Sequence, residues 1–320
     1  MNNWMSEIIA TAWLGYGLIF CLGACVGSFL NVCIVRLPKG ESLVRPRSHN
    51  EDGDPIAWYD NIPVVSWFVL RGRDRKTGKP FSFGYPLVEA LVGALFVACA
   101  LVFPWQEALA AMVLCALLVG GSFIDLKTLT LPDGFTVGGA AIGLVVSVCL
   151  PGIHVADGVP GNLLNMVQSL MVSATGVVVG GGFLLWLLVF GEKIFRKPVM
   201  GEGDVLLGGC IGAFCGWQGA VFALFGGSII ALAVILPLML VEYFKPESAK
   251  RKISSAKTTQ SQSPENPGTG ASESPQLGFG SSIPFGPWLA LGALGYLFWA
   301  APYVDAYFSR IKEVFLLMPS

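Results

Sequence analysis

The sequence predicts an all-α membrane protein, a polytopic bundle of about eight transmembrane helices with a cytoplasmic loop domain between the first and the second. Three observations support this fold class. The composition is 54% hydrophobic and only 13% charged, which is too apolar for the surface of a soluble protein of 320 residues. The chain repeatedly supplies apolar runs of the length that crosses a bilayer core. Nearly all of its basic residues also fall on one side of the predicted membrane.

The apolar runs that predict membrane-spanning helices differ in length. The first is too long for the core of a signal peptide and no basic residue precedes it, so we expect it to be retained as a span. The run over residues 205–217 is short for a full span. The predicted spans cover residues 8–35, 85–103, 106–124, 135–150, 164–190, 205–217, 219–243 and 286–304.

Lys and Arg are distributed unevenly between the two sides of the predicted membrane. Threading the chain through these spans puts all but two of the 20 Lys and Arg on one side. The two exceptions are Arg310 and Lys312. By the positive-inside rule, the basic side is cytoplasmic and the amino terminus is outside.

Two polar segments interrupt the apolar runs. Residues 36–84 form the only substantial polar domain, which is too small for a doubly wound nucleotide-binding fold. Residues 244–285 are rich in Ser, Pro, Thr, Lys and Gln, a composition that predicts a disordered cytoplasmic linker. The predicted organisation is a first span (1–35), the cytoplasmic loop domain (36–84), a transmembrane core (85–243), the linker (244–285), a last span (286–304) and an outer tail (305–320).

Small residues inside the predicted spans indicate packing rather than chemistry. All 8 cysteines lie within apolar runs, so we expect no disulfide framework. Glycines gather over residues 176–182 and 208–216, where small side chains let membrane helices approach each other closely.

A few carboxylates lie at or near the predicted spans, where deep burial costs on the order of a few kcal/mol. Glu89 lies one turn into the second span and either has a function or pairs with a basic or polar neighbour. Asp133, which follows Pro132, suits an N-cap for the fourth span. Asp305 lies beyond the last span, where we expect it to be solvated.

Asp125 and Asp204 are far apart in the sequence but lie at one predicted depth. Asp125 ends the third span and Asp204 begins the sixth, both at the cytoplasmic face. Two carboxyl groups within a few ångströms cannot both ionise cheaply, so one keeps its proton while the other acts as a base. This is how aspartyl proteases activate water. Gly201 and Gly203 would let the backbone approach Asp204 closely. The alternative is that the two aspartates are unrelated helix caps at the membrane interface.

The motifs around these acids resemble those of the type IV prepilin peptidases, which are GxGD intramembrane aspartyl proteases with leader peptidase and N-methyltransferase activities. The resemblance extends over nearly the whole chain. The matching segments are GSFLNVCIVRLPKG (27–40), PIAWYDNIPVVSWFVLRGR (55–73), YPLVEALVGALF (85–96), IDLKTLTLPD (124–133), GEGD (201–204) and IPFGPWLALGA (283–293).

The resemblance implies that Asp125 and Asp204 are the catalytic pair. It implies cleavage of the basic leader of type IV prepilins or pseudopilins after a glycine at the cytoplasmic face of the bacterial inner membrane. The new amino terminus would then be methylated with S-adenosylmethionine, and no nucleic acid is expected as a partner. The implied supporting residues of the catalytic motifs are Lys127, Pro132, Asp133, Gly201 and Gly203. Those implied for methyl transfer or the loop are Trp58, Tyr59, Asp60, Asn61, Pro63 and Glu89.

The loop domain departs from the family pattern in one respect. Many relatives carry two CxxC pairs there, a zinc signature, but no cysteine occurs in residues 36–84. Threonine is not a usual zinc ligand and oxygen donors suit harder ions, so we expect polar contacts in place of zinc. The cysteine positions are occupied by His49, Asp52, Asp74 and Thr77.

Two alternative functions stay open at this point. The first is a peptidase without methyltransferase activity, because the loop that lacks the zinc cysteines is expected to help form the methyl-donor site. The more distant one is a proton- or cation-coupled transporter, which would bury its acids near the bilayer midplane. Here Asp125 and Asp204 are predicted at the membrane edge.

Overall fold

The helices follow the apolar runs, because a backbone inside a bilayer must satisfy its N–H and C=O groups within its own segment. The computed structural model describes residues 3–44, 62–73, 75, 78–80, 82–155, 158–243 and 284–317. Within these residues the only β contact is an isolated bridge between Arg73 and Pro80. Of the described helices, 6 are long and apolar enough to cross a membrane. The prediction of an all-α, multi-pass membrane protein is confirmed, whereas the predicted count of eight spans is not.

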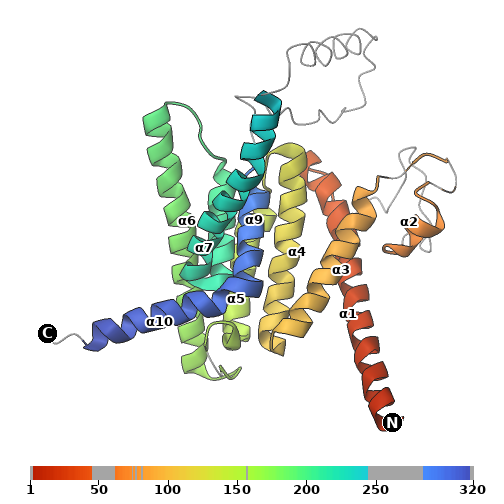
Figure 1. Cartoon of the computed structure of the whole chain (residues 1–320), viewed down its shortest axis with the longest axis horizontal. Helices are drawn as coiled ribbons and strands as arrows, with labels where there is room; N and C mark the ends of the chain where they lie inside the picture. The colour runs from red at the N-terminus through yellow and green to blue at the C-terminus, as the bar shows by residue number, and fades with distance from the viewer. Residues whose placement is uncertain are drawn as a thin grey trace.

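The long helices form a bundle in which α4 contacts both halves (Figure 1). One buried cluster joins α4 to α1 and α3, and a second joins it to α6, α7 and α9. The long helices are α1 (Asn3–Arg36), α3 (Gly84–Val102), α4 (Trp105–Thr128), α5 (Asp133–Cys149), α6 (Leu163–Phe195), α7 (Glu202–Tyr243), α9 (Gly286–Gly295) and α10 (Ala301–Leu317). The short elements are η1 (Leu37–Lys39), α2 (Val65–Val69), η3 (Pro151–Ile153) and the π-helix η4 (Tyr296–Ala300).

The helix α7 consists of two helical parts that meet at Gly216. Gly216 has φ 68 and ψ −179, a left-handed φ that favours glycine. A Cβ on Gly180 would touch both the Gly208 carbonyl oxygen and the Ala220 Cβ. On one continuous helix, residues 208 and 220 would be about 18 Å apart. The chain therefore folds back at Gly216, as Figure 1 shows.

The carbonyl of Ala213, in the last turn before this reversal, has side-chain partners. The last carbonyls of a helix have no partner within the helix. Ser173 donates its hydroxyl hydrogen to the Ala213 carbonyl at 2.7 Å, and His154 Nε2 lies 3.2 Å from the same oxygen. Because a carbonyl only accepts, Nε2 carries the hydrogen in this contact. The reversal is thus held by side chains from α6 and from the segment after η3.

The closest helix contact is the glycine seam, which we define as Gly176 and Gly180 on α6 with Gly208 and Gly212 on α7. A Cβ added to Gly176 would collide with the Gly212 carbonyl oxygen, and one added to Gly212 would collide with the Gly176 carbonyl oxygen. The two backbones are therefore in direct contact along the seam. The predicted packing role of these glycines is confirmed.

The structure tests two expectations about single carboxylates. The expected capping role of Asp133 is wrong, because Asp133 is the first residue of α5 and Pro132 takes the N-cap position without a side-chain capping bond. An acid in the first turn still interacts favourably with the helix dipole. Asp305 is exposed, as expected, and its Oδ1 also accepts a hydrogen bond from the Tyr296 hydroxyl at 3.4 Å.

Candidate active site

Asp125 lies close to the end of α4 and is buried, with 5% of its surface exposed. Its Oδ2 accepts a hydrogen bond from the backbone N–H of Gly286 at 3.0 Å. Gly286 is the first residue of α9, and N–H groups at a helix start lack partners within the helix and carry partial positive charge. The start of α9 is therefore suited to hold the carboxyl group of Asp125 in one orientation.

Asp204 lies in the first turn of α7 and is also buried, with 7% of its surface exposed. Its backbone N–H donates to the Gly201 carbonyl at 3.2 Å, which closes the first turn. A Cβ on Gly201 would lie 3.6 Å from Asp204 Oδ2, an ordinary van der Waals contact. Alanine could therefore occupy position 201 without steric conflict, so the expectation that Gly201 allows a close backbone approach is not supported by this geometry.

Gly203 does permit a close approach. A Cβ on Gly203 would lie 2.8 Å from the Leu131 Cβ, closer than packed side chains come to one another. Leu131 belongs to the segment that follows α4, so this contact brings the end of α4 against the start of α7. Leu129, with φ 55, turns the chain back after α4, and its N–H donates to the Asp125 carbonyl at 2.8 Å.

The structure brings Asp125 and Asp204 together. The charge of Asp125 acts on Asp204, so the two carboxyl groups lie within electrostatic range of each other. Both belong to the same end of the bundle, where α4 ends and α7 and α9 begin (Figure 1). Two buried carboxyl groups within electrostatic range do not both ionise easily, so one can keep its proton while the other accepts a proton from water.

The other predicted residues of the catalytic motifs lie around this pair. Lys127 is exposed in the last turn of α4. The Pro132 carbonyl accepts the Phe135 N–H at 2.9 Å and so shapes the first turn of α5. Lys127 thus lies at the end of α4, and Pro132 precedes the first residue of α5.

Glu89 contacts the backbone of the loop domain. It is buried on α3 with 9% exposure, and its Oε2 accepts the backbone N–H of Val64 at 2.7 Å. Val64 has φ 62, a backbone conformation that β-branched residues rarely adopt. This hydrogen bond therefore links α3, the second membrane helix, to the loop at Val64, the residue after Pro63.

Most predicted loop residues lie outside the described residues. This applies to four residues proposed for methyl transfer and to the four at the cysteine positions of relatives. Within the part of the chain that the structure describes, no three His, Cys, Asp or Glu side chains could hold one metal ion. The predicted residues that lie outside the described ranges are Trp58, Tyr59, Asp60, Asn61, His49, Asp52, Asp74 and Thr77.

Gly286 is the contact that sequence reasoning missed. Its motif, IPFGPW, resembled the last span of a known family but offered no side chain with evident chemistry. Gly286 contributes a backbone N–H that binds Asp125. It also has no Cβ, and a Cβ added at this position would lie only 2.8 Å from Asp125 Oδ2. The signal in the sequence was a glycine followed by Pro287 at the start of an apolar run, a pattern typical of a helix beginning.

Comparison with known proteins gives consistent matches. Residues 112–236 match the Type IV leader peptidase family, and residues 21–103 match the Bacterial Peptidase A24 N-terminal domain. The first segment contains Asp125 and Asp204, and the second contains Glu89. No solved structure matches the chain significantly.

Several curated relatives with the same name match much of the chain. A Prepilin leader peptidase/N-methyltransferase of Myxococcus xanthus is 38% identical over 224 residues, which cover 68% of this chain and 62% of that protein. A protein of the same name from Xanthomonas campestris is 30% identical over 320 residues, covering 92% of this chain and 94% of the relative. Another from Aeromonas hydrophila is 34% identical over 256 residues, covering 72% and 83% respectively.

Proposed function

Because the chain belongs to the type IV leader peptidase family, we propose that it removes the basic leader of type IV prepilins or pseudopilins and then N-methylates the new amino terminus. The observation that carries the proposal is the buried pair of Asp125 and Asp204, which belong to the two catalytic motifs. The multi-pass bundle fits a substrate whose apolar stem lies in the bilayer beside the enzyme.

The proposed cleavage uses the aspartate pair and one water molecule. One carboxylate accepts a proton from the water molecule. At the same time, the water oxygen attacks the carbonyl carbon of the glycine before the cleavage site. The other carboxyl group, which holds the shared proton, donates it to the carbonyl oxygen as negative charge develops there. As the tetrahedral intermediate collapses, the C–N bond breaks and the carboxyl group that took a proton from water gives it to the leaving amine. One hydroxyl of the intermediate returns its proton to the other carboxylate, which restores the pair. The products are the leader carboxylate and a mature protein with a free amino terminus.

In this scheme, Gly286 is a positioning residue. Its N–H holds Asp125 Oδ2 at 3.0 Å, so the carboxyl group has a fixed orientation before substrate arrives. Gly203 supports the same geometry, because the contact with Leu131 fixes the end of α4 against α7. Glu89 is proposed to keep the loop domain in place through Val64.

S-adenosylmethionine would supply the methyl group in the second reaction. We propose that the donor binds near the loop domain, in which Pro63 is described, and near Glu89 of α3, which contacts that domain through Val64. The donor set His49, Asp52, Asp74 and Thr77 does not suit zinc, so no step is assigned to a metal. The site is proposed to face the cytoplasm at the inner membrane of a bacterium, in agreement with the positions of the basic loops.

The assay for the proposed function measures both reactions at once. The purified protein is incubated with a type IV prepilin and labelled S-adenosylmethionine, and the mature amino terminus is analysed by mass spectrometry. We expect loss of the leader at the glycine and one added methyl group. Cleavage without methylation would show that the protein is a peptidase without methyltransferase activity. An intact prepilin would overturn the proposal.

A Gly286→Ala substitution tests the positioning of Asp125. The added Cβ would lie 2.8 Å from Asp125 Oδ2, so the carboxyl group must shift. We expect kcat for cleavage to fall by about tenfold to a hundredfold with little change in KM, since misplacing a reacting group by about 1 Å can cost this much. Gly295→Ala, on the same helix α9 with nothing within 4 Å of the added Cβ, serves as the matched control. Equal rates for both variants would remove Gly286 from the site.

A further inference from the structure

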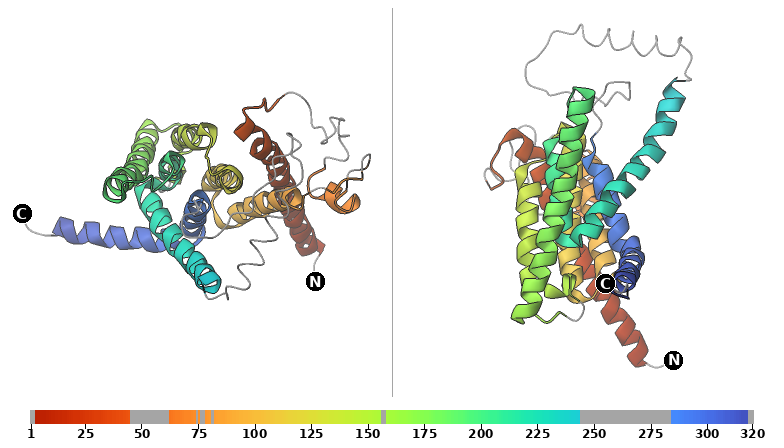
Figure 2. Two further views of the ribbon diagram at one scale, coloured as in Figure 1. Left: turned by 90° about the horizontal axis from the view of Figure 1, so that it is seen from above. Right: turned by 90° about the vertical axis from the view of Figure 1, so that its left-hand side faces the viewer.

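The helix α10 runs crosswise to the other helices instead of continuing along the bundle. It follows the π-helix η4 directly and extends past α6 beyond the edge of the bundle (Figures 1 and 2). α9 begins beside Asp125, and the 10 residues of α9 with the 5 of η4 rise about 20 Å. Since a bilayer core is about 30 Å thick, α10 starts in the half of the bilayer opposite the aspartate pair, about 10 Å from the far boundary.

Side-chain contacts hold the first half of α10 in this direction. The Tyr296 hydroxyl donates to Asp305 Oδ1 at 3.4 Å, which links η4 to α10. The ring of Phe308 packs edge-on against Trp217, with centroids 4.9 Å apart, immediately after the reversal at Gly216. The bend is therefore formed by specific contacts with the bundle and is not only a change of direction at its end.

The described side chains of α10 divide into different faces. Ala301, Val304, Phe308 and Ile311 are half-buried at spacings of three and four, so they share the face toward the bundle. Asp305 and Arg310 are exposed and lie off this face. The sequence of α10 thus has the pattern of an amphipathic helix.

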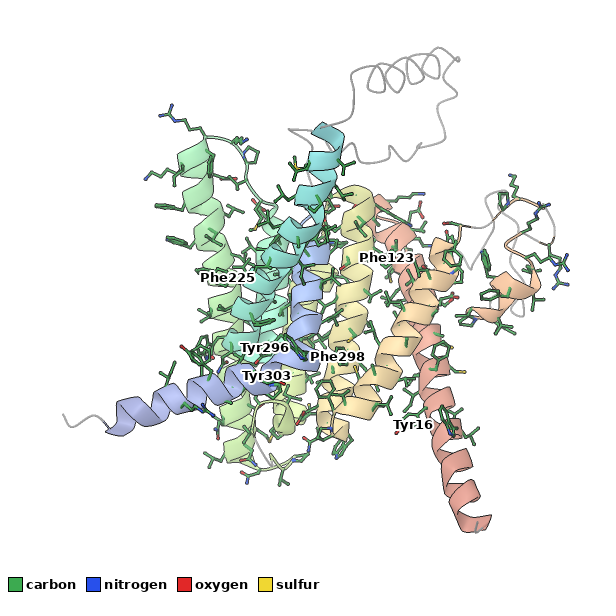
Figure 3. All side chains as sticks on the ribbon, viewed as in Figure 1. Tyr16, Phe123, Phe225, Tyr296, Phe298 and Tyr303 are labelled. Atoms are coloured by element: carbon green, nitrogen blue, oxygen red, sulfur yellow. The ribbon has the colours of Figure 1, made fainter. Side chains whose placement is uncertain are left out.

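Large aromatic side chains lie exposed next to the face toward the bundle. Trp299, Tyr303 and Tyr307 are spaced four residues apart and are 70%, 68% and 63% exposed. The ring centroids of Trp299 and Tyr303 are 5.9 Å apart. Figure 3 labels Tyr303 near the start of α10. Trp and Tyr concentrate at membrane–water interfaces, where the ring is apolar and its polar atom reaches water.

We propose that α10 is an interfacial helix that lies in the lipid headgroup region of the same bilayer, with Trp299, Tyr303 and Tyr307 in contact with phospholipid. The occupant of this face is lipid because the stretch long and apolar enough to cross a membrane, Gly286–Phe308, includes the first half of α10. The helix then leaves the bundle in the half of the bilayer opposite the aspartate pair. Beyond α6, no described element covers it (Figure 2). An amphipathic helix in this position buries its apolar side in the acyl boundary and keeps Arg310 at the water edge.

The test compares two neighbouring residues by cysteine labelling. Tyr307→Cys and Ala306→Cys lie about 100° apart around the helix, and both positions are exposed in the protein alone. Residues 301–320 contain no native cysteine, so mass spectrometry of this peptide reports only the introduced thiol. Each full-length variant is placed, one copy per disc, in phospholipid nanodiscs and treated with a charged, membrane-impermeant maleimide, which reaches both faces of the disc.

We expect Ala306→Cys to react about tenfold faster than Tyr307→Cys in nanodiscs, because a thiol among lipid is shielded from water and does not ionise. After unfolding in detergent and denaturant, the two rates should agree. Tyr303→Cys repeats the test and should behave like Tyr307→Cys. Equal fast rates in nanodiscs would show that α10 projects into water. Equal slow rates would show that protein or lipid covers it on all sides. Either result would overturn the proposal.

Discussion

An Asp125→Asn variant, and equally an Asp204→Asn variant, is expected to cleave prepilin on the order of 10⁴-fold more slowly than the parent protein. Asparagine keeps the size of the side chain but can neither accept the proton of the attacking water nor hold the proton shared by the pair. The measurement is single-turnover cleavage followed by mass spectrometry of the leader. Because the two groups act as one unit, the double variant should be little slower than either single one.

The control for this prediction is Asp305→Asn. It removes a carboxylate near the opposite end of the bundle, and the amide oxygen can still accept the Tyr296 hydrogen bond. Its cleavage rate should equal that of the parent. Near-normal cleavage by either the Asp125→Asn or the Asp204→Asn variant would remove that residue from the catalytic pair.

The second large effect concerns stability and the glycine seam. Gly212→Ala would place a Cβ against the Gly176 carbonyl oxygen, so α6 and α7 must move apart. Overpacking of this kind destabilises by about 1–3 kcal/mol. A backbone clash is relieved less easily than a side-chain clash, so we expect the upper part of that range and a clear fall in Tm in nanodiscs.

A matched glycine on the same helix pair separates this clash from the general effect of alanine. Gly182 lies on α6, and a Cβ added there would meet no atom within 4 Å. Gly182→Ala should therefore leave Tm unchanged or raise it slightly, because alanine favours helix over glycine by about 1 kcal/mol. Equal Tm changes for Gly212→Ala and Gly182→Ala would contradict close backbone packing at the seam.

Much of the fold could be predicted because hydrophobic length and charge asymmetry are properties of local sequence. Residues 205–217 and 219–243 were predicted as separate helices, and the structure separates the corresponding parts of α7 at Gly216. The direction of α10 could not be predicted, because it depends on contacts with Trp217 and Tyr296 from other elements. The capping role expected of Asp133 was wrong because Pro132 already supplies the residue before the first turn.

The candidate site was predicted only where side chains carry the chemistry. Asp125 and Asp204 stand out as acids at the edges of apolar runs. Gly286 has no side chain, so its hydrogen bond to Asp125 required a structure. Glu89 was expected either to have a function or to have a charged or polar partner, whereas it accepts a backbone N–H from Val64, a contact that no pattern in the sequence indicates.

The hydrogen bond between Gly286 and Asp125 joins residues 161 positions apart. Because the chain is synthesised from its amino terminus, α4 and α7 are made before α9, and Asp125 lacks this partner until α9 has been translated. Under the proposed function, a nascent protein holding both acids would therefore be a poor protease until α9 docks. Synthesis in this order would delay full proteolytic activity, and a chain whose translation stops before α9 would have both acids but lack the N–H group that positions Asp125.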